Sequence, residues 1–246
     1  MAAPLSRAVL RERTAEIFTY LRFLDRSVQT GAAIVCAGMT TPMPLTKDLT
    51  HTLKANTYLL LYNIVEATMT QAIADIHNAL DANLPELDHL QPALFSHVLR
   101  RFRASTFELG NVSAAHGGQL LVRLWLDDYA NQIKTGGNNP LFSGNVDSRK
   151  IIEIGAKYGF ASEADKHLRE RSLQTTKLKR NELAHGSTSF RDCGQGLSTA
   201  TLTSEAVALI RCLRRVVSAV EDYLIARRYL RPQMPGAVLA PLQPQV

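Results

Sequence analysis

The apolar run from Leu53 to Leu80 constrains the fold more than any other part of this 246-residue chain. Its large side chains recur at steps of three and four residues, which is the period of a helix face. Four further apolar residues between them widen the stripe almost all the way round, so the helix should be buried at the centre of the core. The stripe consists of Tyr58, Leu61, Val65, Met69, Ala72, Ile76 and Leu80, and the widening residues are Leu59, Leu60, Tyr62 and Ile64.

Helical periodicity continues on both sides of this run. A first helix follows Leu10 and ends before Gly31, and a last one starts at Thr203 or Ser204 and carries a stripe that includes Val207. Between them the pattern predicts helices over 92–109, 118–133, 148–158 and 162–185, with a break near Ser172. No stretch is rich in strand signals, so the sequence predicts an all-α bundle that forms a single domain.

Glycine and proline divide the chain into three parts. Residues 1–45 should form the N-terminal helix and a loop, 31–45, that packs down through Ile34, Val35, Met39 and Met43. Residues 46–230 form the main helical domain, which contains a turn-rich loop over 135–145. Residues 231–246 hold four prolines and should be a flexible tail.

Composition indicates the cellular compartment in which we expect the protein. The three cysteines form no C-x-x-C pair, which favours a reducing compartment. No apolar run approaches the roughly 18 residues that a membrane span needs, and the N-terminus lacks the apolar core of a signal peptide. We therefore expect a cytoplasmic protein with no membrane partner. Its formal charge of +6 is compatible with nucleic acid.

The sequence lacks the motifs of several common nucleotide-binding and metal-binding sites. It contains no P-loop, no G-x-G-x-x-G after a strand and no H-E-x-x-H, and its seven histidines lack the spacing of metal ligands. The adjacent acids Asp127 and Asp128 diverge by about 100° on a helix, so they cannot chelate from one face. We expect neither a metal nor a cofactor.

The segment Lys177 to Gly186, K-L-K-R-N-E-L-A-H-G, carries the groups that metal-free phosphodiester cleavage needs. Arg180 can hold a phosphate and offset charge that grows in the transition state, and His185 can move a proton near neutral pH. On one helix these two side chains lie about 140° apart, so a second copy of the helix across a two-fold axis would help to bring the groups together. The alternative interpretation of the same residues is an ordinary basic helix end with a surface histidine.

This segment resembles the R-x(4–6)-H motif of the HEPN superfamily, in its R-N-x-x-x-H form. The helix L-L-L-Y-N-I-V-E-A-T at 59–68, the string R-N-E-L-A-H-G-S-T-S-F at 180–190 and the final long helix resemble a bacterial branch described as MAE-type. The resemblance covers roughly residues 46–228. It implies a HEPN-like helical bundle that dimerises around the R-x4-H motif.

The resemblance also implies an activity, that of a metal-independent endoribonuclease. Such proteins cleave RNA by attack of its own 2′-hydroxyl, which leaves a 2′,3′-cyclic phosphate and a 5′-hydroxyl. The residues carried over as catalytic are Arg180, His185, Asn181 and Glu66. Glu66 could equally be a structural acid paired with Arg180 or another cation inside the bundle.

Substrate contacts follow from the basic residues beside the motif and from the resemblance. Lys177 and Lys179 supply positive charge for a phosphate groove, with a solvated helix face as the alternative. Asn63 lies three residues before Glu66 and could face the motif, although a core hydrogen bond is the other role open to it.

The biological role implied by the resemblance is that of a toxin or antiphage-defence effector. Its partners would be RNA, a second copy of the chain and an antitoxin or another defence-system protein. Some HEPN toxins carry a tyrosine two places after the histidine, where this chain has Ser187, so regulation at that tyrosine is not expected. Two alternatives stay open: a non-catalytic HEPN scaffold that binds RNA, a nucleotide or a partner, and a helical interaction protein in which the motif is coincidental.

Overall fold

A single long helix, α2 (Lys47–Asn83), forms the spine of the protein. Thr46 starts it, because its side-chain oxygen accepts a hydrogen bond from the Leu49 N–H at 3.2 Å. Most of the large apolar side chains along it are almost completely shielded from solvent, which confirms the predicted central helix, although Leu59 and Leu60 are half-buried. The computed structural model describes residues 4–35, 37–38, 40–103, 117–136, 141–142, 145–160 and 171–232.

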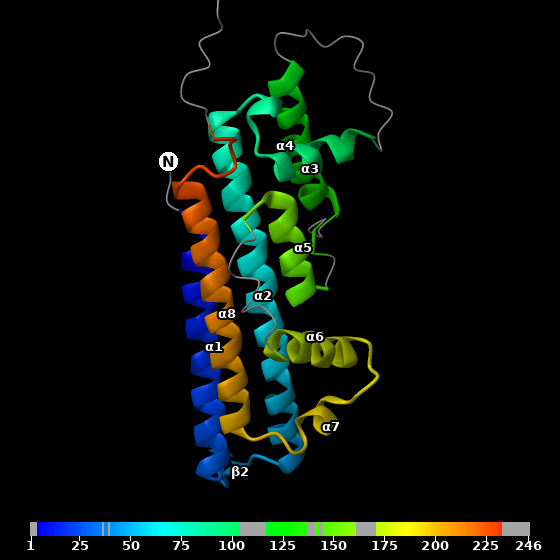
Figure 1. Ribbon diagram of the computed structural model, residues 1–246. Helices are drawn as coiled ribbons and strands as arrows, with labels where there is room; N and C mark the ends of the chain where they lie inside the picture. Colours follow the sequence, from blue (N-terminus) through cyan, green and yellow to red (C-terminus); the bar gives the residue numbers. More distant parts are fainter. Residues whose placement is uncertain are drawn as a thin grey trace, which may run out of the picture.

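Two further long helices run beside the spine. Helices α1 (Ser6–Gln29) and α8 (Thr199–Ile225) pack against α2 and against each other (Figure 1). Helix α8 begins earlier than the sequence predicted, because Ser198 caps it by accepting the Thr201 N–H at 3.0 Å. The apolar stripes of α1 and α8 face this three-helix core, although Val28 and Val207 are 41% and 38% exposed.

A side chain of α2 caps α1 across the core. Both carboxylate oxygens of Asp75 accept backbone hydrogen bonds, from Leu5 N–H at 3.1 Å and from Ser6 N–H at 2.9 Å. These donors belong to the first turn of α1, where no local side chain caps the helix. Asp75 is only 6% exposed, so this link fixes the N-terminal end of α1 to the interior.

The shorter helices gather around the C-terminal half of α2. They are the 3₁₀ turn η1 (Leu87–His89) with α3 (Pro92–Arg103), α4 (Gly117–Gly136) and α5 (Ser148–Tyr158). Helix α3 packs against α4 and α5, and α4 packs against η1 (Figure 1). The segment after α8 ties this end together, because Gln91 N–H donates to Tyr229 and Arg231 N–H donates to His89, at 2.9 and 2.8 Å.

The remaining helices cover the N-terminal half of the spine. Helix α6 (Arg171–Ala184) crosses α2, and the short α7 (Phe190–Gly194) follows it (Figure 1). Helix α7 approaches the first turns of α2 at backbone distance, since a Cβ atom on Gly194 would lie 1.9 Å from the carbonyl oxygen of His51. This close contact holds the chain that leaves the R-x4-H motif.

The loop over 31–45 differs from its prediction. It contains a two-residue antiparallel pair, β1 (Ala33–Ile34) with β2 (Met43–Pro44), in which Ile34 lies opposite Met43. We expected its apolar side chains to pack down, yet Val35 is 70% exposed and Met43 50% exposed. Met39 lies outside the described residues.

Other predicted features also lie outside the described residues. They are the continuation of the helix predicted at 92–109 beyond residue 103, the start of the one predicted at 162–185, most of the loop at 135–145, and the tail from residue 233 onward. Within the described ranges, no helix combines the length and the apolar character that a membrane crossing requires.

Candidate catalytic site

The R-x4-H motif lies where α6 ends. His185 is the first residue past the helix, and its N–H still donates to the Asn181 carbonyl oxygen at 2.9 Å. Gly186 then takes a left-handed conformation, with φ of +70°, which lets Ser187 N–H return to the Glu182 carbonyl oxygen at 3.0 Å. This turn ends the helix and leaves the His185 imidazole exposed to solvent.

Arg180 lies against the spine. Its guanidinium carbon is 4.5 Å from the centroid of the Tyr62 ring on α2, and its Nη1 donates to Asn181 Oδ1 at 3.0 Å. A cation over an aromatic face is attracted by the electron density of the ring. The half-buried Arg180 side chain is therefore oriented by both helices.

Tyr62 is the buried centre of the site, at 3% exposure. Its hydroxyl oxygen accepts the backbone N–H of Val146 at 3.0 Å. Burial raises the pKa of Tyr62, and the negative charges of Glu66 and Asp147 act in the same direction, while the Val146 N–H and Arg180 oppose them. Glu66 from α2 and Arg180 from α6 thus act on the same phenol.

The segment that precedes α5 ties α6 to its neighbours. Asn181 Nδ2 donates to Asn145 Oδ1 at 3.3 Å, and Lys177 Nζ lies 2.8 Å from Asp147 Oδ2. Asp147 also caps α5, since its Oδ1 accepts the Lys150 N–H at 2.9 Å. Burial disfavours the charged form of Asp147, but the hydrogen bonds from Lys177 and Lys150 outweigh it and lower the pKa.

The sequence-predicted residues do not all join this arrangement. Arg180 and Asn181 are held together, and Glu66 lies within electrostatic range of the same Tyr62 ring. Asn63 is exposed. His185 lies beyond the helix end, and no described contact joins its side chain to Arg180 within the protomer.

The two lysines differ in their surroundings. Lys177 forms an ion pair with Asp147, and the two side chains are 23% and 12% exposed. Lys179 pairs with Glu182 one turn along the helix at 2.8 Å, and both of these side chains are 38% exposed. Lys177 is thus engaged in the internal structure of the site, whereas Lys179 stays at the surface.

Sequence reasoning missed three residues of the site, namely Tyr62, Asn145 and Asp147. A signal for Tyr62 was available, because it precedes Glu66 by four residues and therefore shares its helix face. Asn63 is turned by about 100° from Tyr62. The residues before α5 gave no signal, since their role depends on a contact between segments 30 or more positions apart.

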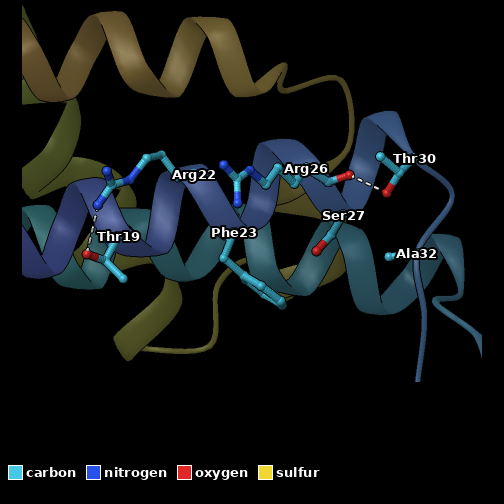
Figure 2. Close-up of a pocket in the computed structure, with 7 residues that line it drawn as sticks. All are labelled: Thr19, Arg22, Phe23, Arg26, Ser27, Thr30 and Ala32. Atoms are coloured by element: carbon cyan, nitrogen blue, oxygen red, sulfur yellow. Dashed lines mark hydrogen bonds between the residues drawn. The ribbon is translucent and has the colours of Figure 1, made fainter. Parts of the chain in front are cut away.

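A hollow of about 440 Å³ lies along the C-terminal half of α1. Figure 2 shows Arg22 and Arg26 pointing to one side of α1 and Phe23 to the other. Arg22 donates to Thr19 Oγ1 at 3.3 Å, and Thr30 donates to the Arg26 carbonyl oxygen at 2.7 Å. Its lining holds no carboxylate and no imidazole, so this hollow lacks the proton-transfer groups of the α6 site.

The all-helical fold agrees with a comparison to known families. The sequence model of the MAE_28990-like HEPN family matches residues 3–229. The chain belongs to the HEPN superfamily. This match extends from α1 to the segment after α8 and includes the N-terminal helix.

HEPN domains are often ribonucleases or bind nucleotides and RNA. No curated protein and no solved structure matches the chain. Among the described residues, no group of three or more His, Cys, Asp and Glu side chains could hold a metal ion.

Proposed function

We propose that this HEPN protein is a metal-independent endoribonuclease that works as a homodimer. The observation that carries the proposal is the fixed position of Arg180 over Tyr62, five residues before the exposed His185 that follows the same helix. Arg180 is oriented by neighbours on two helices, while His185 is open to a substrate or to a second protomer. Preorganised charge together with a proton carrier that the substrate can reach is what transesterification of RNA requires.

The chemistry assigns one role to each residue. The RNA 2′-oxygen attacks the adjacent phosphorus, the P–O5′ bond breaks, and the products are a 2′,3′-cyclic phosphate and a 5′-hydroxyl. The 2′-hydroxyl loses a proton and the 5′-oxygen gains one, and His185 carries out proton transfer. Arg180 binds the phosphate oxygens, with Asn181 as a neutral neighbour that fixes its orientation.

A dimer supplies what one protomer lacks. Two proton transfers occur at opposite ends of the breaking bond, and His185 of each protomer can serve one of them. The R-x4-H helices of both copies would then line a single cleft. Glu66 contributes through the Tyr62–Arg180 contact and is assigned a positioning role.

The deciding experiment incubates the wild type, His185→Ala and Arg180→Ala with total tRNA and an mRNA transcript in the presence of EDTA. We expect cleavage by the wild type alone, 2′,3′-cyclic phosphate ends, and no cleavage of DNA. Inhibition by EDTA would contradict the metal-free mechanism. Binding of RNA by all three proteins without cleavage would favour the alternative, a non-catalytic HEPN scaffold.

The cellular role follows from the activity. A ribonuclease of this kind would be a toxin or an antiphage effector, held in check by a partner protein. Overexpression of the wild type should then stop growth, and overexpression of His185→Ala should not. Growth arrest by both proteins would contradict a toxic nuclease.

A further inference from the structure

The short segment before α5 is anchored at two consecutive residues. The backbone N–H of Val146 donates to the Tyr62 hydroxyl oxygen at 3.0 Å, which ties the segment to α2. Asp147 pairs with Lys177 at 2.8 Å, which ties it to α6. Val146 and Asp147 are 1% and 8% exposed, so the backbone next to Asn145 has a fixed position between the two helices.

Asn145 lies at the surface of this segment and bonds to the R-x4-H motif. Its Oδ1 accepts a hydrogen bond from Asn181 Nδ2 at 3.3 Å, while Asn181 Oδ1 accepts one from Arg180 Nη1 at 3.0 Å. An amide has a donor end and an acceptor end, so these two contacts together require one orientation of Asn181. In the reversed orientation its NH₂ group would face the Arg180 N–H, donor against donor, and its oxygen would face that of Asn145.

The orientation of Asn181 determines where the Arg180 guanidinium points. The Tyr62 ring attracts the cation to its face, but this attraction does not prevent rotation of the guanidinium about an axis normal to the ring. The hydrogen bond to Asn181 removes that freedom, because a guanidinium is planar and rigid and the direction of one N–H sets the directions of the others. Direction matters here, since bidentate binding of a phosphate needs two parallel N–H groups.

We propose that Asn145 is a positioning residue of the α6 site, which fixes the amide of Asn181 and through it the direction of Arg180. Asn145 lies 36 positions before Asn181 and outside the R-x4-H motif. It acts on the reaction only through the motif residues, and its effect on rate rests on the proposed ribonuclease function.

Two substitutions of similar size separate this role from a contact with RNA. Asn145→Leu removes the acceptor without changing the charge. It should lower kcat for RNA cleavage about three- to tenfold, the effect of one lost hydrogen bond, because Arg180 is then oriented less well. KM should stay within about twofold of the wild type, since the positive charge that attracts RNA is unchanged.

Asn145→Asp should show the opposite pattern. Its carboxylate keeps an oxygen for the Asn181 N–H, so kcat should stay within about twofold of the wild type. Its negative charge repels the RNA backbone, so KM should rise. An unchanged kcat in Asn145→Leu would overturn the proposal, and so would the same loss of kcat in both variants.

Asn78→Leu provides the matched control, because Asn78 is an exposed asparagine on the other half of α2. It should leave both kcat and KM unchanged. Urea midpoints of all three variants should stay close to that of the wild type, since each replaces an exposed side chain. A loss of kcat in Asn145→Leu that is matched by a loss of stability would indicate a general structural role and would overturn the positioning role.

NMR signals of side-chain N–H groups test the same inference without RNA. The signals of the Asn181 amide and of the Arg180 Nε–H should both shift in Asn145→Leu and in neither case in Asn78→Leu. Absence of both shifts would overturn the proposal whether or not the wild type cleaves RNA. Both shifts in a protein that does not cleave RNA would refute the ribonuclease activity alone and support the positioning of Arg180 by Asn145.

Discussion

The Arg180 guanidinium lies 4.5 Å above the Tyr62 ring and joins the R-x4-H helix to the central helix of the bundle. Tyr62 is held from its other end by the Val146 N–H, so the phenol connects α2, α6 and the start of α5. Disturbing Tyr62 should therefore change the orientation of Arg180 without altering the motif itself.

Two substitutions at Tyr62 separate the ring from the hydroxyl. Tyr62→Phe keeps the ring beneath Arg180, and Tyr62→Leu removes it. Loss of a cation–π contact costs about 1–2 kcal/mol when partly buried, so Tyr62→Leu should slow RNA cleavage by about five- to thirtyfold. Tyr62→Phe should retain most of the activity. Equal cleavage rates in the two variants would contradict the positioning role of the ring.

Lys177 and Lys179 form a matched pair for testing structure against RNA binding. Lys177→Met leaves the buried Asp147 without its cation and should lower the free energy of unfolding by about 1–3 kcal/mol. Lys179→Met breaks a surface pair and should cost at most about 0.5 kcal/mol. Urea denaturation measures both. A weaker RNA complex with unchanged stability in Lys177→Met would show that this lysine acts on substrate.

Asp75 should contribute strongly to stability although it is far from the motif. Asp75→Ala leaves the Leu5 and Ser6 N–H groups without an acceptor and should cost about 1–3 kcal/mol. The control is Asp81→Ala on the same helix, which removes an exposed pair with Arg123 and should cost about 0–1 kcal/mol. Equal losses of unfolding free energy would contradict a capping role for Asp75.

As the pH is lowered, the free energy of unfolding should begin to fall before most carboxylates become protonated. Burial lowers the pKa of His77 to about 3 and that of His97 to about 4. Below pH 6.5 the unfolded chain binds a proton on each imidazole that the folded chain does not, so lowering the pH favours unfolding. Each group can contribute up to about 1.4 kcal/mol per pH unit.

The variant His77→Gln isolates one of these groups. It cannot titrate, so the loss of unfolding free energy between pH 7 and pH 5 should be smaller than in the wild type. Urea midpoints across that range provide the measurement. The same pH slope in both proteins would show that His77 is protonated in the folded state.

The sequence predicted the helical class and the central helix because periodicity reports burial directly. The run from Leu53 to Leu80 is apolar almost all round, and only a helix packed on several sides can bury it. The prediction that the loop at 31–45 packs down was wrong for a related reason. Its apolar residues indicate what the chain would gain by burial, but they cannot show whether a neighbouring surface is present.

The site was predictable where its residues are close in sequence. Arg180, Asn181 and His185 fall within one helix end, and α6 presents the first two together. Asp147 and Asn145 join the site through tertiary contacts, and such contacts produce no periodic pattern in the sequence. The ion pair of Lys177 was not predicted for this reason, since Asp147 lies 30 positions away in the sequence.

Helix α2 runs without interruption from Tyr62, beneath Arg180, to His77, which packs among the rings of Trp125, Tyr129 and Tyr158. Tyr62 and His77 lie 15 residues apart on it, which is about 22 Å along a helix axis. Because this helix is uninterrupted, helix geometry sets the separation between the Arg180–Tyr62 contact and the rings around His77, and loop conformation does not. Adding or deleting one residue between Tyr62 and His77 would turn one of these side chains by about 100° relative to the other. The length of the central helix thus fixes this distance, and its middle segment should tolerate substitution far better than any change in length.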